Sequence, residues 1–150
     1  MSADQGKYAE TKVKQHLDKL KGKFVFFDFE RIPDARSGRG SGKNKVGDFQ
    51  FFSAQEASIH GAIDSKELSH DYLLPKGNVS QLPKMQRRSW AGGQCGLIIF
   101  HTRLKLWRVA HLDWLIERRN KPSWDLRELP LYESHTEALT AFFNKIGIDV

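Results

Sequence analysis

The stretch GDFQFFSAQEASIHGAIDSKEL, residues 47–68, decides the fold. The aromatic run within residues 48–53 predicts one strand, and the alternation along residues 57–68 predicts another. Side chains alternate between the two faces of a strand, so the second strand sorts its residues into two sets. One face carries Ile59, Gly61, Ile63 and Ser65, and the other carries His60, Ala62, Asp64 and Lys66.

Asp48, Asp64 and Lys66 form a candidate catalytic set. Two carboxylates near strand ends suit a hard divalent cation such as Mg²⁺, and the carbonyl of Ser65 is a possible further ligand. Lys66 shares its face with Asp64, so its ammonium could orient a water and neutralise charge on a phosphate. An Asp-Ser-Lys triplet by itself is typical of a surface ion pair. Ile59 and Ile63 favour an interior strand instead, where unpaired charges are costly.

The segments before residue 47 predict a helix and a strand. Ala9, Val13, Leu17 and Leu20 share one face of a helix over residues 4–20, which ends at Lys21-Gly22-Lys23. Glu10 lies at the margin of that face. The aromatic run at residues 24–30 predicts a strand.

The segments after residue 68 predict a second helix and a hairpin. We expect a helix over residues 81–90, capped by Asn78 or Ser80 and ended by Gly92-Gly93. Strands at 94–100 and 104–109 follow as a hairpin. We expect the remainder to be helical, with a capping box at Ser134-His-Thr-Glu137, an apolar stripe through Leu139, Phe142, Phe143 and Ile146, and a stop at Gly147. The order predicts an α/β fold with a central mixed sheet flanked by helices.

Length and composition limit the classes of protein. A chain of 150 residues suits a single domain, 1–150, with a core at about 6–114 and a C-terminal helical extension at about 115–150. No apolar run is long enough to span a membrane, and the polar N-terminus lacks a signal peptide's apolar stretch, so we expect a cytoplasmic protein. Cys95, the single cysteine, predicts a small buried hydrophobe. Gly38–Gly42 lacks the Lys-Ser/Thr ending of a P-loop.

The charge distribution predicts a polyanionic partner. Lys and Arg number 24 against 18 Asp and Glu, a net charge of +6. Between residues 31 and 45 five cations accompany one acid, directly before Asp48. We expect DNA phosphate contacts from this loop and from a second basic cluster. These residues are Arg36, Arg39, Lys43 and Lys45 in the loop, and Lys84, Arg87 and Arg88 in the second cluster.

The order of these motifs resembles the PD-(D/E)XK nuclease superfamily. Glu10 in a first helix, Gly47-Asp48-Phe49 opening a strand, Asp64-Ser65-Lys66 ending the next and Gln81 on a following helix are similar to RecU-type and related phage or archaeal Holliday junction resolvases. The resemblance covers about residues 6–114. QLPKMQRRSWAGGQCGLIIFH, residues 81–101, is particularly similar.

The resemblance implies a restriction-endonuclease-like core and DNA hydrolysis with Mg²⁺, for which Mn²⁺ could substitute. Asp48 and Asp64 would be metal ligands, Lys66 the catalytic lysine, Glu10 an accessory acid and Gln81 a residue at the margin of the site. Many members carry Glu where this chain has Asp64, and the shorter side chain would draw the metal nearer the strand. Glu67 alternates to the opposite face and ranks below Asp64.

Several functions stay open at the level of sequence. A Holliday junction resolvase-like endonuclease is favoured over a site-specific duplex endonuclease of homing or restriction type. A non-catalytic DNA-binding module and an RNA-processing nuclease are further alternatives. Paired cuts would require a homodimer or higher homo-oligomer. His70 and Asp71 are candidates for phosphate contact, and we expect the four tryptophans to fill a core or an interface rather than to stack on bases.

Overall fold

A five-stranded mixed sheet forms the centre of the protein, in a computed structural model that describes residues 7–33 and 45–150. The strand order is β1-β2-β3-β5-β6. The bounds are β1 Phe27–Arg31, β2 Phe49–Ala54, β3 Ser58–Leu68, β5 Gln94–His101 and β6 Leu106–His111. The pair β3–β5 is parallel and the other neighbours are antiparallel. The predicted mixed sheet is confirmed.

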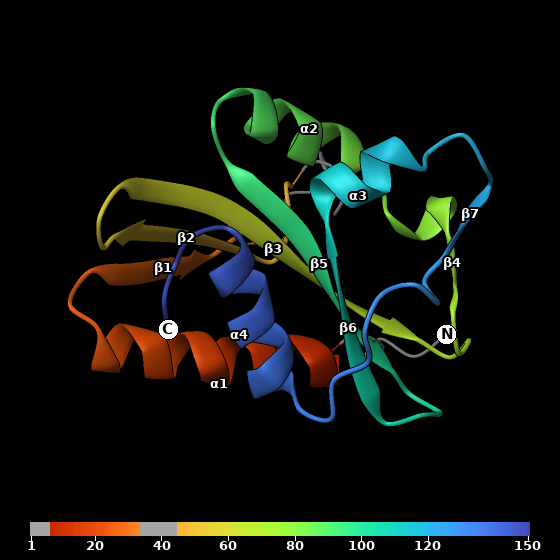
Figure 1. The fold of residues 1–150 in the computed structure, drawn as a ribbon, viewed down its shortest axis with the longest axis horizontal. Helices are drawn as coiled ribbons and strands as arrows, with labels where there is room; N and C mark the ends of the chain where they lie inside the picture. The colour runs from red at the N-terminus through yellow and green to blue at the C-terminus, as the bar shows by residue number, and fades with distance from the viewer. Residues whose placement is uncertain (1–6, 34–44) are drawn as a thin grey trace.

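Helices cover both faces of this sheet (Figure 1). α1 (Lys7–Lys23) and α4 (His135–Lys145) lie on one face, whereas α2 (Leu82–Trp90) and α3 (Leu112–Glu117) lie on the other. A two-stranded sheet of β4 (Leu73–Pro75) and β7 (Ser123–Asp125) stands at one end. The 3₁₀ helix η2 (Lys76–Asn78) connects β4 toward α2.

The two faces of β3 contribute to two separate hydrophobic cores, as alternation requires. Ile63 belongs to the core under α1 and α4, where Phe51 meets Phe142 and Phe143 edge to face. Ala62 belongs to the core under α2 and α3, together with the fully buried Met85. The face of β3 that carries Asp64 and Lys66 is therefore the α2 face.

The close approach of β3 to β5 depends on Gly61. A Cβ there would lie 1.7 Å from the Gln94 carbonyl oxygen and 2.8 Å from the Phe51 ring. Any larger residue at position 61 would push β3 away from β5, and the displacement would extend along β3 to Asp64.

The C-terminal third departs most from the sequence prediction. The expectation of a wholly helical remainder is wrong, because residues 118–134 contain β7 and irregular chain. β7 has three residues, too few to show a period. The α4 prediction is confirmed: the Ser134 hydroxyl accepts from the Glu137 N–H at 3.1 Å, and Gly147 ends the helix at φ +96°. α4 packs in the same core as α1, not as an appendage.

Three smaller predictions about helix ends and strands need correction. α1 continues through Gly22 to Lys23, and its last three residues, 21–23, are exposed. The N-cap of α2 is Gln81, not Asn78 or Ser80, and its side chain makes no capping hydrogen bond. β1 begins at Phe27 rather than residue 24. No helix in the described ranges has the length and apolarity that crossing a bilayer would need.

Candidate active site

Asp48 stands directly beside β3 at the start of β2. The β2–β3 register ends at the pair Phe49↔Ile63, and one residue further along places Asp48 opposite Asp64. The Asp48 N–H donates to the Ile63 carbonyl at 2.9 Å. Gly47 permits this approach, because a Cβ there would lie 2.7 Å from the same carbonyl oxygen. The glycine of Gly47-Asp48-Phe49 thus has a steric purpose beside the carboxylate.

Both oxygens of the Asp48 carboxylate have partners. Oδ2 accepts from the Ser65 N–H at 2.8 Å, a buried contact between the two strands. Oδ1 lies 3.4 Å from the Lys45 ammonium, and both side chains are largely buried. Lys45, predicted as a DNA contact, is therefore also part of the carboxylate site. A residue three positions before Asp48, in a loop, gave no periodic signal for this role.

Asp64, Lys66 and Gln81 form the second half of the site. The Lys66 ammonium lies 2.9 Å from Asp64 Oδ2 and donates to Gln81 Oε1 at 3.1 Å. Asp64 is 2% exposed and Gln81 is 7% exposed. The contact with Asp64 is a close ion pair rather than a well-directed hydrogen bond, since Oδ2 has no partner of hydrogen-bonding geometry. The structure thus brings Gln81 from α2 onto the lysine of β3.

The electrostatics of the site centre on Asp64. Burial raises the pKa of Asp64 to about 7, and the nearby Asp48 carboxylate acts in the same direction. Lys66 and Lys45 oppose this rise but do not cancel it. Two neighbouring carboxylates thus stay close with incomplete compensation, an arrangement that a cation would stabilise.

The donors suit a hard divalent cation. The carboxylates of Asp48 and Asp64 are oxygen ligands, and the Asp64 Oδ2 atom retains accepting capacity. Within residues 7–33 and 45–150, no cluster of three or more His, Cys, Asp or Glu side chains could hold a metal ion. A cation here would have two carboxylate side chains from the described protein. This fits Mg²⁺, which commonly binds through one or two carboxylates and keeps several waters. The Ser65 carbonyl stays a predicted ligand.

Glu10 lies on the other side of the sheet and pairs with Arg31. Its Oε2 accepts from Arg31 Nε at 2.8 Å, and its side chain is 25% exposed. Glu67 also turns to the α1 side, where its Oε2 accepts from the Ala9 N–H in the first turn of α1 at 2.9 Å. Glu67 is therefore on the face opposite Asp64, as predicted. The accessory role of Glu10 stays a prediction.

The predicted DNA-contacting residues fall into two groups. Arg36, Arg39 and Lys43 lie outside the described residues. Lys84 and Arg87 are exposed on α2, on the same face of the sheet as Asp64 and Lys66. Arg88 is half-buried and donates through Nη1 to Gln50 Oε1 on β2 at 3.0 Å.

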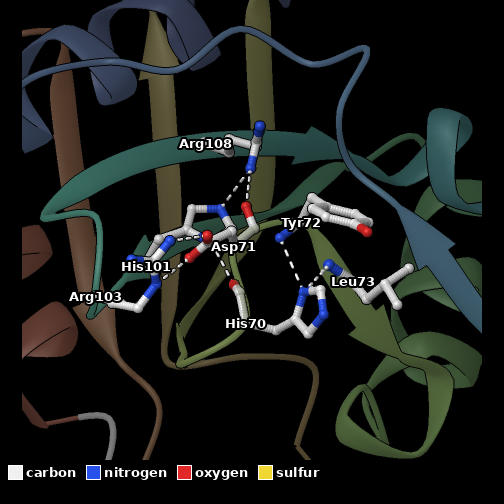
Figure 2. Close-up of polar contacts among 7 residues, drawn as sticks. All are labelled: His70, Asp71, Tyr72, Leu73, His101, Arg103 and Arg108. Atoms are coloured by element: carbon white, nitrogen blue, oxygen red, sulfur yellow. Dashed lines mark hydrogen bonds and ion pairs between the residues drawn. The ribbon is translucent and has the colours of Figure 1, made fainter.

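A second polar cluster, which the sequence did not reveal, lies past the ends of β3 and β5 (Figure 2). Its centre is Arg108, 5% exposed, whose Nη1 donates to the Asp71 carbonyl at 2.7 Å. Arg108 Nε donates to the Leu129 carbonyl at 3.2 Å. Arg108 Nη1 lies 3.1 Å from Nε2 of the fully buried His101, whose Nδ1 lies 3.0 Å from the His70 carbonyl.

These contacts define the protonation of His101. An arginine only donates, so Nε2 accepts, and Nδ1 carries the proton that it donates to the carbonyl. Burial lowers the pKa of His101, in agreement with a neutral ring. His70 and Asp71 are also engaged: His70 Nδ1 accepts from the Tyr72 and Leu73 N–H groups, and the Asp71 carboxylate pairs with Arg103. This cluster ties the β3–β4 loop and the chain near residue 129 to β6.

The five-stranded mixed sheet and its flanking helices form the α/β fold that the sequence predicts, and a solved structure shares it. The sheet and flanking helices match the fold of Hjc, a Holliday junction resolvase from the archaeal hyperthermophile Archaeoglobus fulgidus. The two structures superpose with a TM-score of 0.51 at 18% sequence identity, over 85% of this chain and 97% of Hjc. At that identity the likeness concerns the fold.

A second similar structure is D212, a nuclease from a fusselovirus. It aligns with a TM-score of 0.47 at 13% identity, over 94% of each chain. No family model matches this sequence. No curated protein sequence matches it either.

Proposed function

We propose that this protein is a metal-dependent endodeoxyribonuclease that acts in the manner of a Holliday junction resolvase. The observation that carries the proposal is the convergence of Asp48 from β2 with Asp64 and Lys66 from β3, buttressed by Gln81. The resolvase-like fold and the net charge of +6 agree with a DNA substrate.

The two carboxylates of Asp48 and Asp64 would hold Mg²⁺. When bound, the cation would polarise the scissile phosphate and lower the pKa of a water. Lys66 has three N–H donors, of which Gln81 takes one and Asp64 attracts another. The remaining donor is available to a water or a phosphate oxygen. Gln81 therefore acts as a positioning residue, because it restricts where that donor points.

Lys45 has a complementary role in this mechanism. Its ammonium approaches the outer oxygen of Asp48 and lowers the repulsion between the two carboxylates. Resolution of a four-way junction requires two symmetric cuts, so we expect the active form to be a homodimer or a higher homo-oligomer.

The test is cleavage of a four-way junction and of a duplex of matched composition, each in Mg²⁺ and in EDTA. We expect the wild type to cut the junction only with Mg²⁺. Lys66→Ala should lose at least about a hundredfold in rate while keeping most of its junction affinity. Lys14→Ala is the control, since Lys14 forms an exposed pair with Asp18 on α1. Normal cleavage by Lys66→Ala would overturn the mechanism.

A further inference from the structure

The exposed side of α2 carries three side chains that the site itself does not use. Lys84, Arg87 and Trp90 recur at three-residue intervals, so they fall on the solvent side of the helix. Trp90 is 73% exposed, whereas Trp107 is 3% and Trp124 is 1% exposed. Trp90 is thus not a core residue, unlike Trp107 and Trp124, and a place in an interface stays a prediction for it.

Trp90 has no ring partner among the described residues. α2 ends there, and the following backbone turns through Gly92 at φ +93°. Trp114, by contrast, donates to Glu128 and stacks against Arg118. An indole at the end of a helix presents a large apolar face, and its two side-chain torsions make it inexpensive to order on binding.

The charged residues of α2 itself are all basic. They are Lys84, Arg87 and Arg88. Lys84 and Arg87 form no ion pair with any described residue. Such a basic surface is complementary to the phosphate backbone of a nucleic acid. It is less suited to a protein surface that carries charges of both signs.

α2 also begins at the candidate active site. Gln81 precedes its first residue and contacts Lys66, so the helix leads from the site to Trp90. At about 1.5 Å per residue, the nine steps from Gln81 to Trp90 span about 13.5 Å along the axis. That is the scale of a few nucleotides from the scissile phosphate.

We infer that this side of α2 is a DNA-contacting surface on which Lys84 and Arg87 bind phosphates and Trp90 stacks on an uncovered base. The inference rests on the proposed function for the nature of the polymer. In a continuous duplex both faces of every base are covered by neighbours, so an indole can stack on a base only at a branch, gap or end. Trp90 is therefore a specificity-determining residue that favours branched or interrupted DNA.

The experiment measures binding in EDTA, where no cleavage occurs. Fluorescence anisotropy compares a four-way junction, a gapped duplex and a continuous duplex of the same composition, at one stated salt concentration. Trp90→Ala should weaken junction and gap binding on the order of tenfold, and continuous duplex binding by less than about twofold. Trp90→Phe should retain most of the preference, and Trp114→Phe serves as a control with full preference.

Two further measurements separate charge from stacking. Lys84→Ala should weaken binding to all three DNAs alike, and should reduce the slope of log affinity against log salt concentration by about one. A 2-aminopurine at the branch should be quenched by the wild type and not by Trp90→Ala. Equal losses on all three DNAs for Trp90→Ala, or no loss, would overturn the inference. Because these assays use no divalent cation, a protein that binds as expected but never cuts would refute the proposed function alone.

Discussion

The Ser65 N–H donates to Asp48 Oδ2 at 2.8 Å, so the carboxylate that opens β2 is fixed to the backbone between Asp64 and Lys66. Because of this hydrogen bond, the geometry of the site depends on the relative position of β2 and β3. Displacement of either strand would separate the carboxylates, and the residues that set the strand spacing therefore matter as much as the carboxylates themselves.

Gly47→Ala should impair both stability and cleavage. Its Cβ would lie 2.7 Å from the Ile63 carbonyl oxygen, which forces the chain before Asp48 away from β3. We expect a loss of about 1–3 kcal/mol in the free energy of unfolding. Denaturant titration measures it. Gly22→Ala in α1 is the matched control, because nothing lies within 4 Å of its Cβ, and it should stabilise by about 0.5–1 kcal/mol. Equal effects of the two substitutions would contradict the steric argument.

Divalent cations should stabilise the folded protein through Asp48 and Asp64. Binding to the native state alone raises Tm with cation concentration. We expect Mg²⁺ to raise the Tm of the wild type relative to EDTA at pH 8, where Asp64 is mostly charged. Asp64→Asn and Asp48→Asn should lose most of this increase. Asp125→Asn, at a surface pair with Arg127, should keep it. If Mg²⁺ still raised the Tm of both Asp48→Asn and Asp64→Asn, the cation would bind elsewhere.

Acid should destabilise the fold through His16. This ring is 6% exposed on α1, both nitrogens lack hydrogen-bond partners, and burial lowers its pKa from 6.5 to about 4. The unfolded chain binds a proton below pH 6.5 and the folded chain does not, so stability falls as the pH drops from about 6.5 to 4. The full shift corresponds to about 3 kcal/mol.

His16→Leu should remove that part of the pH dependence. Unfolding free energies of the two proteins would be measured at pH 7.5 and pH 4.5. The difference between the two pH values should be smaller in the variant, by up to about 3 kcal/mol. An unchanged pH dependence would show that other groups, such as the half-buried His111 with its pKa lowered to about 4, account for acid sensitivity.

Arg108→Met should destabilise far more than Arg103→Ala. The first substitution leaves the Asp71 and Leu129 carbonyls and His101 Nε2 without their donor in a buried place. We expect a cost of about 2–4 kcal/mol. Arg103 makes an exposed pair with Asp71, which solvent screens, so the loss of this pair should cost much less. Thermal unfolding of both variants checks the order, and the reverse order would refute the role given to the cluster.

The strand pattern predicted the centre of the site because its information is local. Alternation along residues 57–68 was enough to place Asp64 and Lys66 on one face and Glu67 on the other, and the structure agrees. The family motifs predicted Gln81 at the margin of the site, and the structure brings it onto Lys66. Alternation, by contrast, is a feature in which neighbouring residues in the sequence fix one another's direction.

What the sequence did not predict depends either on contacts between distant parts of the chain or on irregular turns. Buried Arg108 donates to two carbonyls and a histidine from three segments. Nothing in the sequence of its own strand predicted these contacts. Lys45 approaches Asp48 through a turn without period. Trp90 is a large apolar residue of a kind that usually packs in a core. Because α2 packs through Met85, Trp90 lies on the exposed side of the helix.

Adjacent residues of β3 make contacts on opposite faces of the sheet. Lys66 contacts Gln81 on the α2 face, and Glu67 accepts from the first turn of α1 on the other face. Deleting or inserting one residue within this strand would exchange the two directions. The acid would then enter the carboxylate pair and the lysine would face the helix N-terminus, where positive charge is unfavourable. Length variation in this molecule is therefore excluded from residues 58–68, even where every individual substitution there would be mild.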